Sequence, residues 1–285
     1  MILVVGATGS LGRKITAELL ARGENVRALV RPGKSAALPD GASVARGDLV
    51  DRDSLERACN GVRAVVTTAS VSKTGTDTIE NVDLVGNQHL IAAAEHAGVE
   101  HFVFTSTLSA SEQSPVPLFK VKAAVEGMLR ASRMAHTILQ PNAFMDVWFP
   151  MLIEGAAASG GPVTLVGQSN RRHAFIAEQD IAAFAAAALS TPAARNSTIV
   201  LGGPDAVTLR DVVGAYERAA GRSIPIRSVA PGEPIPGVPE PVWSLAAALE
   251  TFDSPVPMDE TSGTYGVQLT SVADFARSRV AATTR

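Results

Sequence analysis

Three glycines near the amino terminus have the spacing of a phosphate-binding turn. Gly6, Gly9 and Gly12 directly follow a short apolar segment and open a helical pattern. This spacing permits a tight turn at the first glycine, close approach to a pyrophosphate at the second, and close helix–strand packing at the third. The amide dipoles of the helix then face the phosphate. We therefore predict dinucleotide binding, against the alternative of a merely tight strand–helix turn, by Gly6, Thr8, Gly9, Ser10, Leu11 and Gly12.

Two cations follow the second apolar run. In dinucleotide-binding folds an acid at this place holds the ribose 2′-hydroxyl of NAD, whereas arginine accepts the 2′-phosphate of NADP. The run ends in Arg31-Pro32-Gly33-Lys34 and contains no acid. A planar guanidinium fork and an ammonium point charge both suit a phosphate. We predict NADPH/NADP+ as the cofactor, held by Arg31 and Lys34; a solvated surface loop is the alternative.

Two further strand ends should line the same cofactor. Asp48 and Leu49 close the third predicted strand, where an adenine would lie. The carboxylate of Asp48 suits the adenine amino group and equally suits the cap of the following helix. Small residues follow the fourth strand, leave room for the nicotinamide, and are therefore predicted cofactor contacts: Thr68, Ala69 and Ser70.

An apolar cluster follows the sixth predicted strand, where a parallel sheet places its ligand crevice. Its aromatic and methionine side chains would form a wall for a flat substrate, and core packing explains them equally well. We predict substrate contacts for Phe144, Met145, Trp148 and Phe149. The five histidines have no metal-ligand spacing, so we predict no metal site.

The elements that must position these residues alternate along the first half of the chain. Apolar runs predict strands, and the segments between them predict helices at 10–22, 52–59, 79–97 and 118–132. Runs that are apolar on both faces are typical of a parallel sheet covered by helices. We therefore predict an α/β fold, a Rossmann doubly wound parallel sheet with a smaller C-terminal substrate lobe. The expected strands are 2–5, 26–30, 44–46, 64–67, 102–105 and 137–139.

The rhythm loosens after Pro141, where glycine and proline punctuate the predicted helices. We expect an NADP-binding Rossmann domain over residues 1–145. Residues 146–285 are expected to form the substrate-binding lobe, with some segments returning to the Rossmann sheet.

Composition excludes several classes of partner. The 285 residues carry a formal net charge of −3 and are 46% hydrophobic, as in an ordinary soluble globular protein. Because no basic field or apolar span is evident, we expect no nucleic-acid partner and no membrane anchor. One cysteine, Cys59, fits a reducing cytoplasm, so we expect a cytoplasmic protein whose redox chemistry comes from a bound cofactor.

Several of these motifs together resemble the atypical short-chain dehydrogenase/reductase family, in its NmrA-like and isoflavone-reductase-like branch. The resemblance extends to about residue 230 and implies a Rossmann fold, a nicotinamide cofactor and reductase activity. It rests on Gly6-Ala7-Thr8-Gly9-Ser10-Leu11-Gly12, Gly47-Asp48-Leu49, Phe102-Val103-Phe104-Thr105-Ser106-Thr107, Lys122-Ala123-Ala124-Val125-Glu126 and Thr137-Ile138-Leu139-Gln140-Pro141.

The catalytic pattern of that family is only partly present. The resemblance implies catalytic roles for Thr107 and Lys122, and cofactor contacts for Lys122, Pro141 and Asn142. Leu118 stands where the family has the tyrosine of its Tyr-x-x-x-Lys motif, and Gln140 replaces a usual arginine. The tyrosine acid is therefore missing, which puts the proton source in doubt.

Reduction without that tyrosine needs another proton donor. General acid catalysis is worth roughly 10² to 10⁴ in rate, so its loss slows hydride transfer without forbidding it. The candidates are Lys122, Thr107 and a phenol on the substrate next to the reacting carbonyl. Quinone-like and polycyclic aromatic polyketides carry such phenols, and some of their tailoring ketoreductases resemble this chain in lacking the tyrosine.

Two functions from different classes therefore remain. We predict an NADPH-dependent carbonyl reductase of a hydrophobic polycyclic aromatic or quinone-like small molecule, in tailoring of a secondary metabolite such as a polyketide antibiotic. The alternative is a non-catalytic NADP(H) sensor, because some NmrA-like proteins bind the cofactor to regulate a partner.

Overall fold

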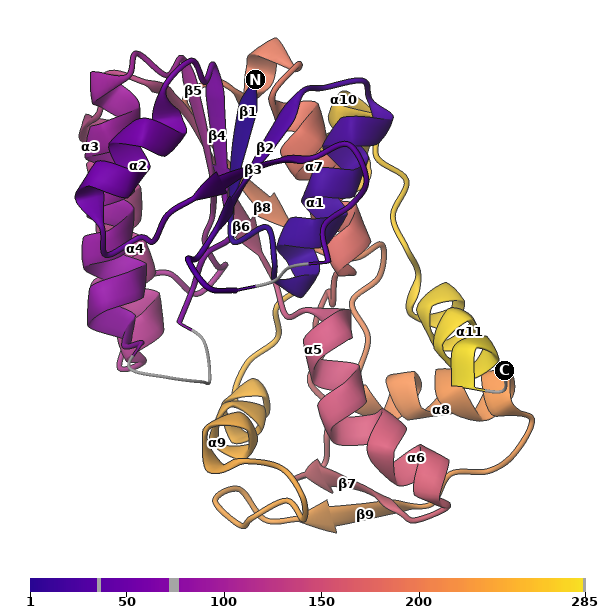
Figure 1. Ribbon diagram of the computed structural model, residues 1–285. Coiled ribbons are helices and arrows are strands. Elements are labelled where there is room, and N and C mark those ends of the chain that lie inside the picture. Colours follow the sequence, from indigo (N-terminus) through magenta and orange to yellow (C-terminus); the bar gives the residue numbers. More distant parts are fainter. Residues whose placement is uncertain (35–36, 72–76, 284–285) are drawn as a thin grey trace. The chain divides into compact units, whose positions relative to one another are not determined.

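The computed structural model describes residues 1–34, 37–71 and 77–283, which form two compact units (Figure 1). Unit 1 comprises Met1–Pro141, Ile181–Leu201 and Tyr265–Val267. Unit 2 comprises Asn142–Asp180, Gly202–Thr264 and Gln268–Arg285. Each unit therefore draws on segments that are distant in the sequence.

Unit 1 is built on a parallel sheet of seven strands in the order β3-β2-β1-β4-β5-β6-β8. The first six strands have the order of a dinucleotide-binding fold, so the predicted doubly wound architecture is confirmed. Most of its strands are buried on both faces, whereas edge strand β3 is largely exposed. The strands are β1 (Ile2–Val5), β2 (Val26–Val30), β3 (Ser43–Arg46), β4 (Ala64–Thr67), β5 (His101–Thr105), β6 (Ala135–Pro141) and β8 (Ser197–Leu201).

Helices cover both faces of this sheet. In Figure 1, α2, α3 and α4 lie on one face and α1 and α7 on the other. One apolar core joins the inner faces of α2, α3 and α4 to the sheet and includes Leu55, Leu90, Phe102 and Leu129. The bounds are α1 (Ser10–Ala21), α2 (Arg52–Cys59), the π-helical segment η1 (Ile79–Gly86), α3 (Asn87–His96), α4 (Pro117–Ala131), α7 (Glu178–Ala188) and the short 3-10 turn η3 (Pro192–Ala194).

Unit 2 has its own core around Phe149, whose ring packs edge-on against Phe175, Tyr216 and Phe275. A two-stranded parallel sheet and several helices surround it. The elements are α5 (Met145–Phe149), the π-helical segment η2 (Pro150–Glu154), α6 (Gly155–Ser159), β7 (Val163–Val166), α8 (Leu209–Ala220), β9 (Ile226–Val229), α9 (Glu240–Leu249), α10 (Asp259–Tyr265), whose last residue belongs to unit 1, and α11 (Val272–Thr283).

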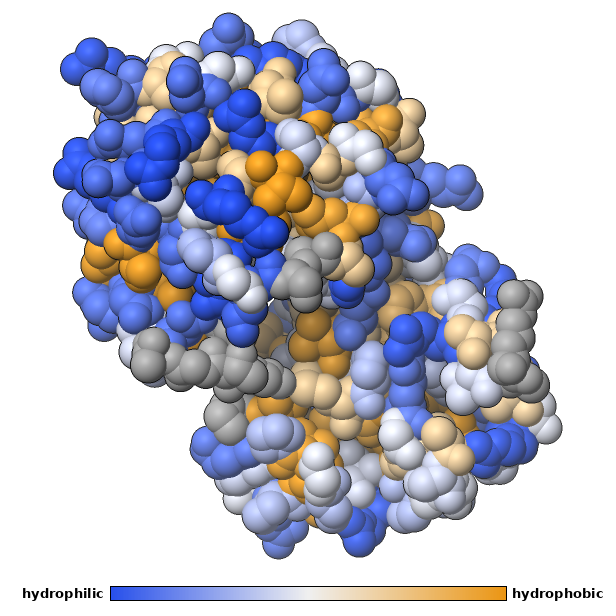
Figure 2. All heavy atoms as spheres, viewed as in Figure 1, coloured by the Kyte–Doolittle hydropathy of each residue, from blue (hydrophilic) through white to orange (hydrophobic). Residues whose placement is uncertain are grey.

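The surface agrees with the composition. On the face drawn in Figure 2, hydrophilic residues cover most of unit 1, and apolar residues gather in small groups. Val44 and Val50, about half exposed, are among the large apolar side chains at its surface. Exposed apolar side chains of this kind are ordinary on a protein surface.

Candidate functional site

The turn after β1 is shaped by glycines at two positions. Gly6 has a φ of +84°, and a Cβ there would lie 2.7 Å from Thr68 Oγ1 and 2.9 Å from Ala69 N. A Cβ on Gly12 would collide with the carbonyl oxygen of Gly6. The backbone of Gly6 therefore lies directly against the residues that follow β4, and the start of α1 lies directly against the turn, with no room for a side chain at either glycine.

Gly9 is different, because its own backbone does not demand glycine. Its φ of −76° and ψ of 169° suit any residue, and a Cβ would meet only the Gly6 carbonyl oxygen, at 3.3 Å. Gly9 is the N-cap of α1 and provides no side-chain cap, and Thr8, Gly9 and Ser10 are exposed. A helix N-terminus without a capping side chain attracts anions, so the predicted turn fits a pyrophosphate.

The predicted 2′-phosphate cations lie beyond the end of β2. Lys34 is exposed, whereas the guanidinium of Arg31 donates from Nη1 to Asp77 Oδ2 at 2.9 Å. Arg46 Nη1 donates to the carbonyl oxygen of Lys34 at 2.7 Å and so fixes the loop that carries both cations. Asp77 and Arg46 were not predicted, because each meets this loop only through the fold.

The predicted adenine contacts lie at the end of β3. Asp48 Oδ1 accepts from the amide of Val50 at 3.2 Å, while Asp51 caps α2 by accepting from Ser54 N. The capping role considered for Asp48 is therefore wrong, and its contact with adenine stays a prediction. Leu49 is buried in the core of unit 1.

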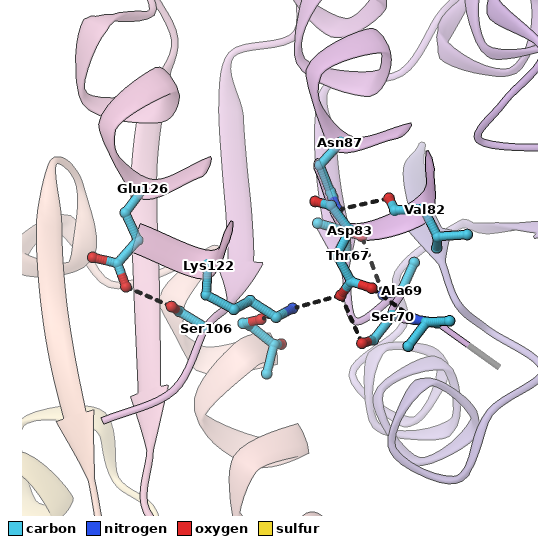
Figure 3. A network of polar contacts seen from close by, with 11 residues as sticks. Thr67, Ala69, Ser70, Val82, Asp83, Asn87, Ser106, Lys122 and Glu126 are labelled. Atoms are coloured by element: carbon cyan, nitrogen blue, oxygen red, sulfur yellow. Dashed lines mark hydrogen bonds and ion pairs between the residues drawn. The ribbon is translucent and has the colours of Figure 1, made fainter. Parts of the chain in front are cut away.

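A buried polar network connects the ends of β4 and β5 through Lys122 (Figure 3). Asp83, fully buried on η1, accepts from Ser70 Oγ at 2.6 Å and from Val71 N at 2.8 Å. Lys122 Nζ lies 3.8 Å from Asp83 Oδ1 and donates to the Thr105 carbonyl oxygen at 3.1 Å. Asp83 was missed by sequence reasoning, because nothing near it in the sequence points to a lysine on α4.

Burial and charge act on Lys122 in opposite directions. Only 6% of the residue is exposed, and burial lowers the pKa of its ammonium, while the carboxylate of Asp83 raises it. The ammonium also lies 4.8 Å from the centroid of the Phe104 ring. Thr105 Oγ1, beside this lysine, is buried without a hydrogen-bond partner in the described part of the chain. An orphaned polar atom next to a buried amine is typical of a site that receives a ligand.

A second carboxylate, that of Glu126, lies one turn further along α4, and its Oε1 accepts two hydrogen bonds. Glu126 Oε1 accepts from Ser106 Oγ at 2.5 Å and from Gln140 Nε2 at 2.8 Å. The amide of Gln140, which replaces the family arginine, therefore serves this internal network. Thr107, the predicted catalytic hydroxyl, follows Ser106 and is half-buried.

Both tyrosines are engaged elsewhere. Tyr216 donates from its hydroxyl to Glu154 at 2.6 Å inside unit 2, and burial together with that carboxylate raises its pKa. Tyr265 packs edge-on against Phe184. Leu118, half-buried, stands one turn before Lys122 on α4. The structure thus brings Lys122 together with Asp83 and Thr105, and supplies no tyrosine to that network.

The residues after β6 divide into two groups. Met145 and Phe149 are fully buried in the core of unit 2, which matches the core-packing alternative for them. Phe144 and Trp148 are partly exposed, and their contact with a substrate stays a prediction. The carbonyl oxygen of Pro141 accepts from Leu108 N, while the side chain of Asn142 donates to the carbonyl oxygen of Ser254 at 2.8 Å.

Two features are absent from the described ranges, 1–34, 37–71 and 77–283. No helix there is long and apolar enough to cross a bilayer. No cluster there gathers three or more metal-binding His, Cys, Asp or Glu side chains.

Comparison with known proteins identifies the family and supports the fold. The model of the NmrA-like family matches residues 1–273. NAD(P)H azoreductase of Xenophilus azovorans is 30% identical over 296 residues, which cover 99% of each chain. Photosystem II assembly factor Ycf39 of Trieres chinensis is 31% identical over 233 residues, 80% of this chain and 72% of that protein. The crystal structure of Citrobacter sp. triphenylmethane reductase complexed with NADP(H) superposes with a TM-score of 0.81 at 25% identity, covering 98% and 100% of the two chains.

Proposed function

The chain belongs to the NmrA-like family, and from this premise we propose that it is an NADPH-dependent reductase of a hydrophobic aromatic carbonyl compound. The cofactor is NADPH/NADP+, as predicted: one full-length relative is named an NAD(P)H azoreductase, and the solved triphenylmethane reductase holds NADP(H). A family and a fold leave the reaction open, and the side chains of the site decide it.

The proposal rests on a series of contacts between residues at the carboxyl ends of strands β1, β4 and β5 in unit 1. Gly6 abuts Thr68 and Ala69, and Ser70 bonds Asp83, which faces Lys122. The phosphate-binding turn and the buried Lys122 are therefore connected through residues that contact one another. A buried lysine is costly unless it is paired, and Asp83, bonded to Ser70 just after β4, pairs it here.

The residues would divide the work of binding. Gly6, Thr8, Gly9, Ser10, Leu11 and Gly12 would hold the pyrophosphate, and Arg31 and Lys34 the 2′-phosphate. Asp48 and Leu49 would contact the adenine, and Thr68, Ala69, Ser70, Pro141 and Asn142 the nicotinamide half. When bound, NADPH supplies the hydride, while the protein contributes position and electrostatics.

Lys122 has two proposed tasks. Its ammonium would donate to the ribose hydroxyls of the bound cofactor and would stabilise the oxyanion that develops on the substrate carbonyl. The carboxylate of Asp83 raises the pKa of this lysine and so opposes the effect of burial, which lowers it. Thr107, which follows β5, would hydrogen-bond the substrate carbonyl oxygen.

The missing tyrosine favours a substrate that brings its own acid. A phenol next to the reacting carbonyl stabilises the oxyanion through an internal hydrogen bond and donates the proton to it. Hydroxylated quinones and polycyclic aromatic polyketides such as angucyclinones, with a hydroxyl next to the carbonyl, have this arrangement. We therefore propose a tailoring ketoreductase of such a pathway, with Phe144 and Trp148 contacting the flat ring system.

The proposal is tested by following NADPH oxidation at its nicotinamide absorbance against quinones and phenol-bearing polycyclic ketones, with NADPH binding measured in parallel. Each phenol is paired with its methyl ether. We expect turnover with at least one phenol, slowed by about 10² or more in its ether because the internal acid is lost. Equal rates for such a pair would reject substrate-assisted protonation.

A cofactor sensor is the second candidate, favoured by Leu118 in place of the tyrosine and by relatives named as assembly factors. It predicts tight NADPH binding without turnover across the whole panel. Turnover with any member decides for the reductase.

A further inference from the structure

Arg31 does not face the solvent alone. Its Nη1 lies 2.9 Å from Asp77 Oδ2, and the two side chains are 41% and 18% exposed. The arginine lies just past the end of β2, while the aspartate lies between β4 and η1, 46 residues further along the chain. The fold therefore places a carboxylate beside the residue that is proposed to hold the 2′-phosphate of the cofactor.

The position of this carboxylate is fixed from its own side. Asp77 directly precedes Thr78, the N-cap of η1, where Thr78 and Asn81 form a reciprocal capping box. The same helical segment is anchored through Asp83, which accepts from Ser70 Oγ and Val71 N. Asp77 is thus presented from a capped helix start, and its partial burial makes its pairing with Arg31 stronger than that of a fully exposed ion pair.

The loop that carries Arg31 is also held. Arg46 Nη1 donates to the carbonyl oxygens of Arg31 and Lys34, at 3.4 and 2.7 Å. Arg31 and Asp77 are therefore both carried by segments that hydrogen bonds hold in place. The arrangement combines the arginine typical of NADP sites with the acid typical of NAD sites, although the acid comes from a different strand connection.

We propose that Asp77 is a specificity-determining residue that limits the preference for NADPH and lets the protein bind NADH as well, an inference that rests on the proposed function. The carboxylate accepts a hydrogen bond from the ribose 2′-hydroxyl of NADH. It repels the 2′-phosphate of NADPH and competes with it for the guanidinium of Arg31. Arg31 and Lys34 attract the phosphate, so the two cofactors are balanced by neighbouring groups of opposite charge.

The test is a titration of NADPH and of NADH, separately, into wild-type protein, Asp77→Asn and Asp40→Asn. Asparagine keeps the shape of Asp77 and removes its charge. We expect NADPH to bind more tightly and NADH more weakly to this variant, so that the ratio of the two dissociation constants shifts by about tenfold or more. Asp40 is exposed in the β2–β3 connection that also holds Arg31, and it is the matched control for net charge. Asp40→Asn should leave the ratio unchanged.

Two further variants complete the design. Asp77→Ala should move the ratio in the same direction as Asp77→Asn, and Arg31→Ala should move it in the opposite direction by weakening NADPH. A ratio that Asp77→Asn leaves unchanged, in a protein that binds NADPH, overturns this inference and leaves the proposed function standing. Wild-type protein that binds neither cofactor overturns both.

Discussion

A buried lysine dominates the site at the scale of single residues. Burial lowers the pKa of Lys122, and Asp83, at 3.8 Å, acts against that effect. Asp83 is itself held by Ser70 Oγ and Val71 N, so its carboxylate does not depend on the lysine alone. Such a pair contributes little net stability, yet removing one partner is costly because the other charge stays buried.

This pair gives a prediction that separates structure from chemistry. Lys122→Met and Asp83→Asn should each destabilise the fold by about 3 kcal/mol, measured by urea unfolding, because each leaves a buried charge unpaired. The double variant should cost clearly less than the sum of the two. With an active substrate, Lys122→Met should lower kcat by about 10² or more, and the double variant should not restore it.

A structural role alone would give another result. In that case the double variant would recover both stability and turnover. Unchanged turnover in Lys122→Met would remove the lysine from the mechanism.

At the scale of elements, sequence periodicity predicted the strands of the first half of the chain and missed a strand that joins the sheet from a distant segment. Six of the seven sheet strands were predicted within about two residues, because runs apolar on both faces have few other uses. β8 was not predicted, although its segment returns to the sheet beside β6. The predicted helix at 79–97 is a π-helical segment followed by α3.

The same limit applies to the candidate site. The glycine turn and Lys122 were identified from spacing and resemblance, since both patterns lie within a few consecutive residues. Asp83 and Asp77 were not, because they meet Lys122 and Arg31 only after β2, β4 and α4 have assembled. Met145 and Phe149 have the composition of a substrate wall, and burial in the core of unit 2 accounts for them instead.

Strand β5 contributes a prediction about acid stability. His101 Nε2 lies 2.8 Å from Thr137 Oγ1, whose own proton goes to the Ala194 carbonyl oxygen, so the histidine is the donor. Burial, followed by the charge of Arg195, lowers its pKa to about 4. The unfolded chain, with an ordinary pKa near 6.5, binds the proton more readily. Stability is therefore full above pH 6.5 and is lost as pH falls towards 4.

Between pH 7 and pH 5 this histidine should account for a loss of about 2 kcal/mol in the free energy of unfolding. His101→Gln keeps a donor to Thr137 and cannot titrate, so urea unfolding of this variant should show a smaller loss over the same range. Equal pH dependence in the two proteins would reject the assignment.

At the scale of the whole molecule, unit 1 contains both the glycine turn and the Lys122 network, and the family match extends across both units. Relatives of similar identity have names as different as an azoreductase and a photosystem assembly factor. Proteins with different functions thus share this family, and the side chains of the site decide which function this chain has. The reductase activity, the sensor role and the effect of Asp77 all depend on NADPH binding at the turn after β1.

That dependence is tested most directly by calorimetric titration of NADPH into wild-type protein and Gly9→Val. The φ and ψ of Gly9 suit valine, whose Cβ would lie 3.3 Å from the Gly6 carbonyl oxygen, so the turn must shift by only a few tenths of an ångström. The added side chain would occupy the space proposed for the pyrophosphate. We predict one NADPH bound per wild-type chain and no measurable binding to Gly9→Val, with both proteins folded by circular dichroism. Failure of the wild-type protein to bind, or equal affinity in the two proteins, would contradict the assignment of this turn as the cofactor site.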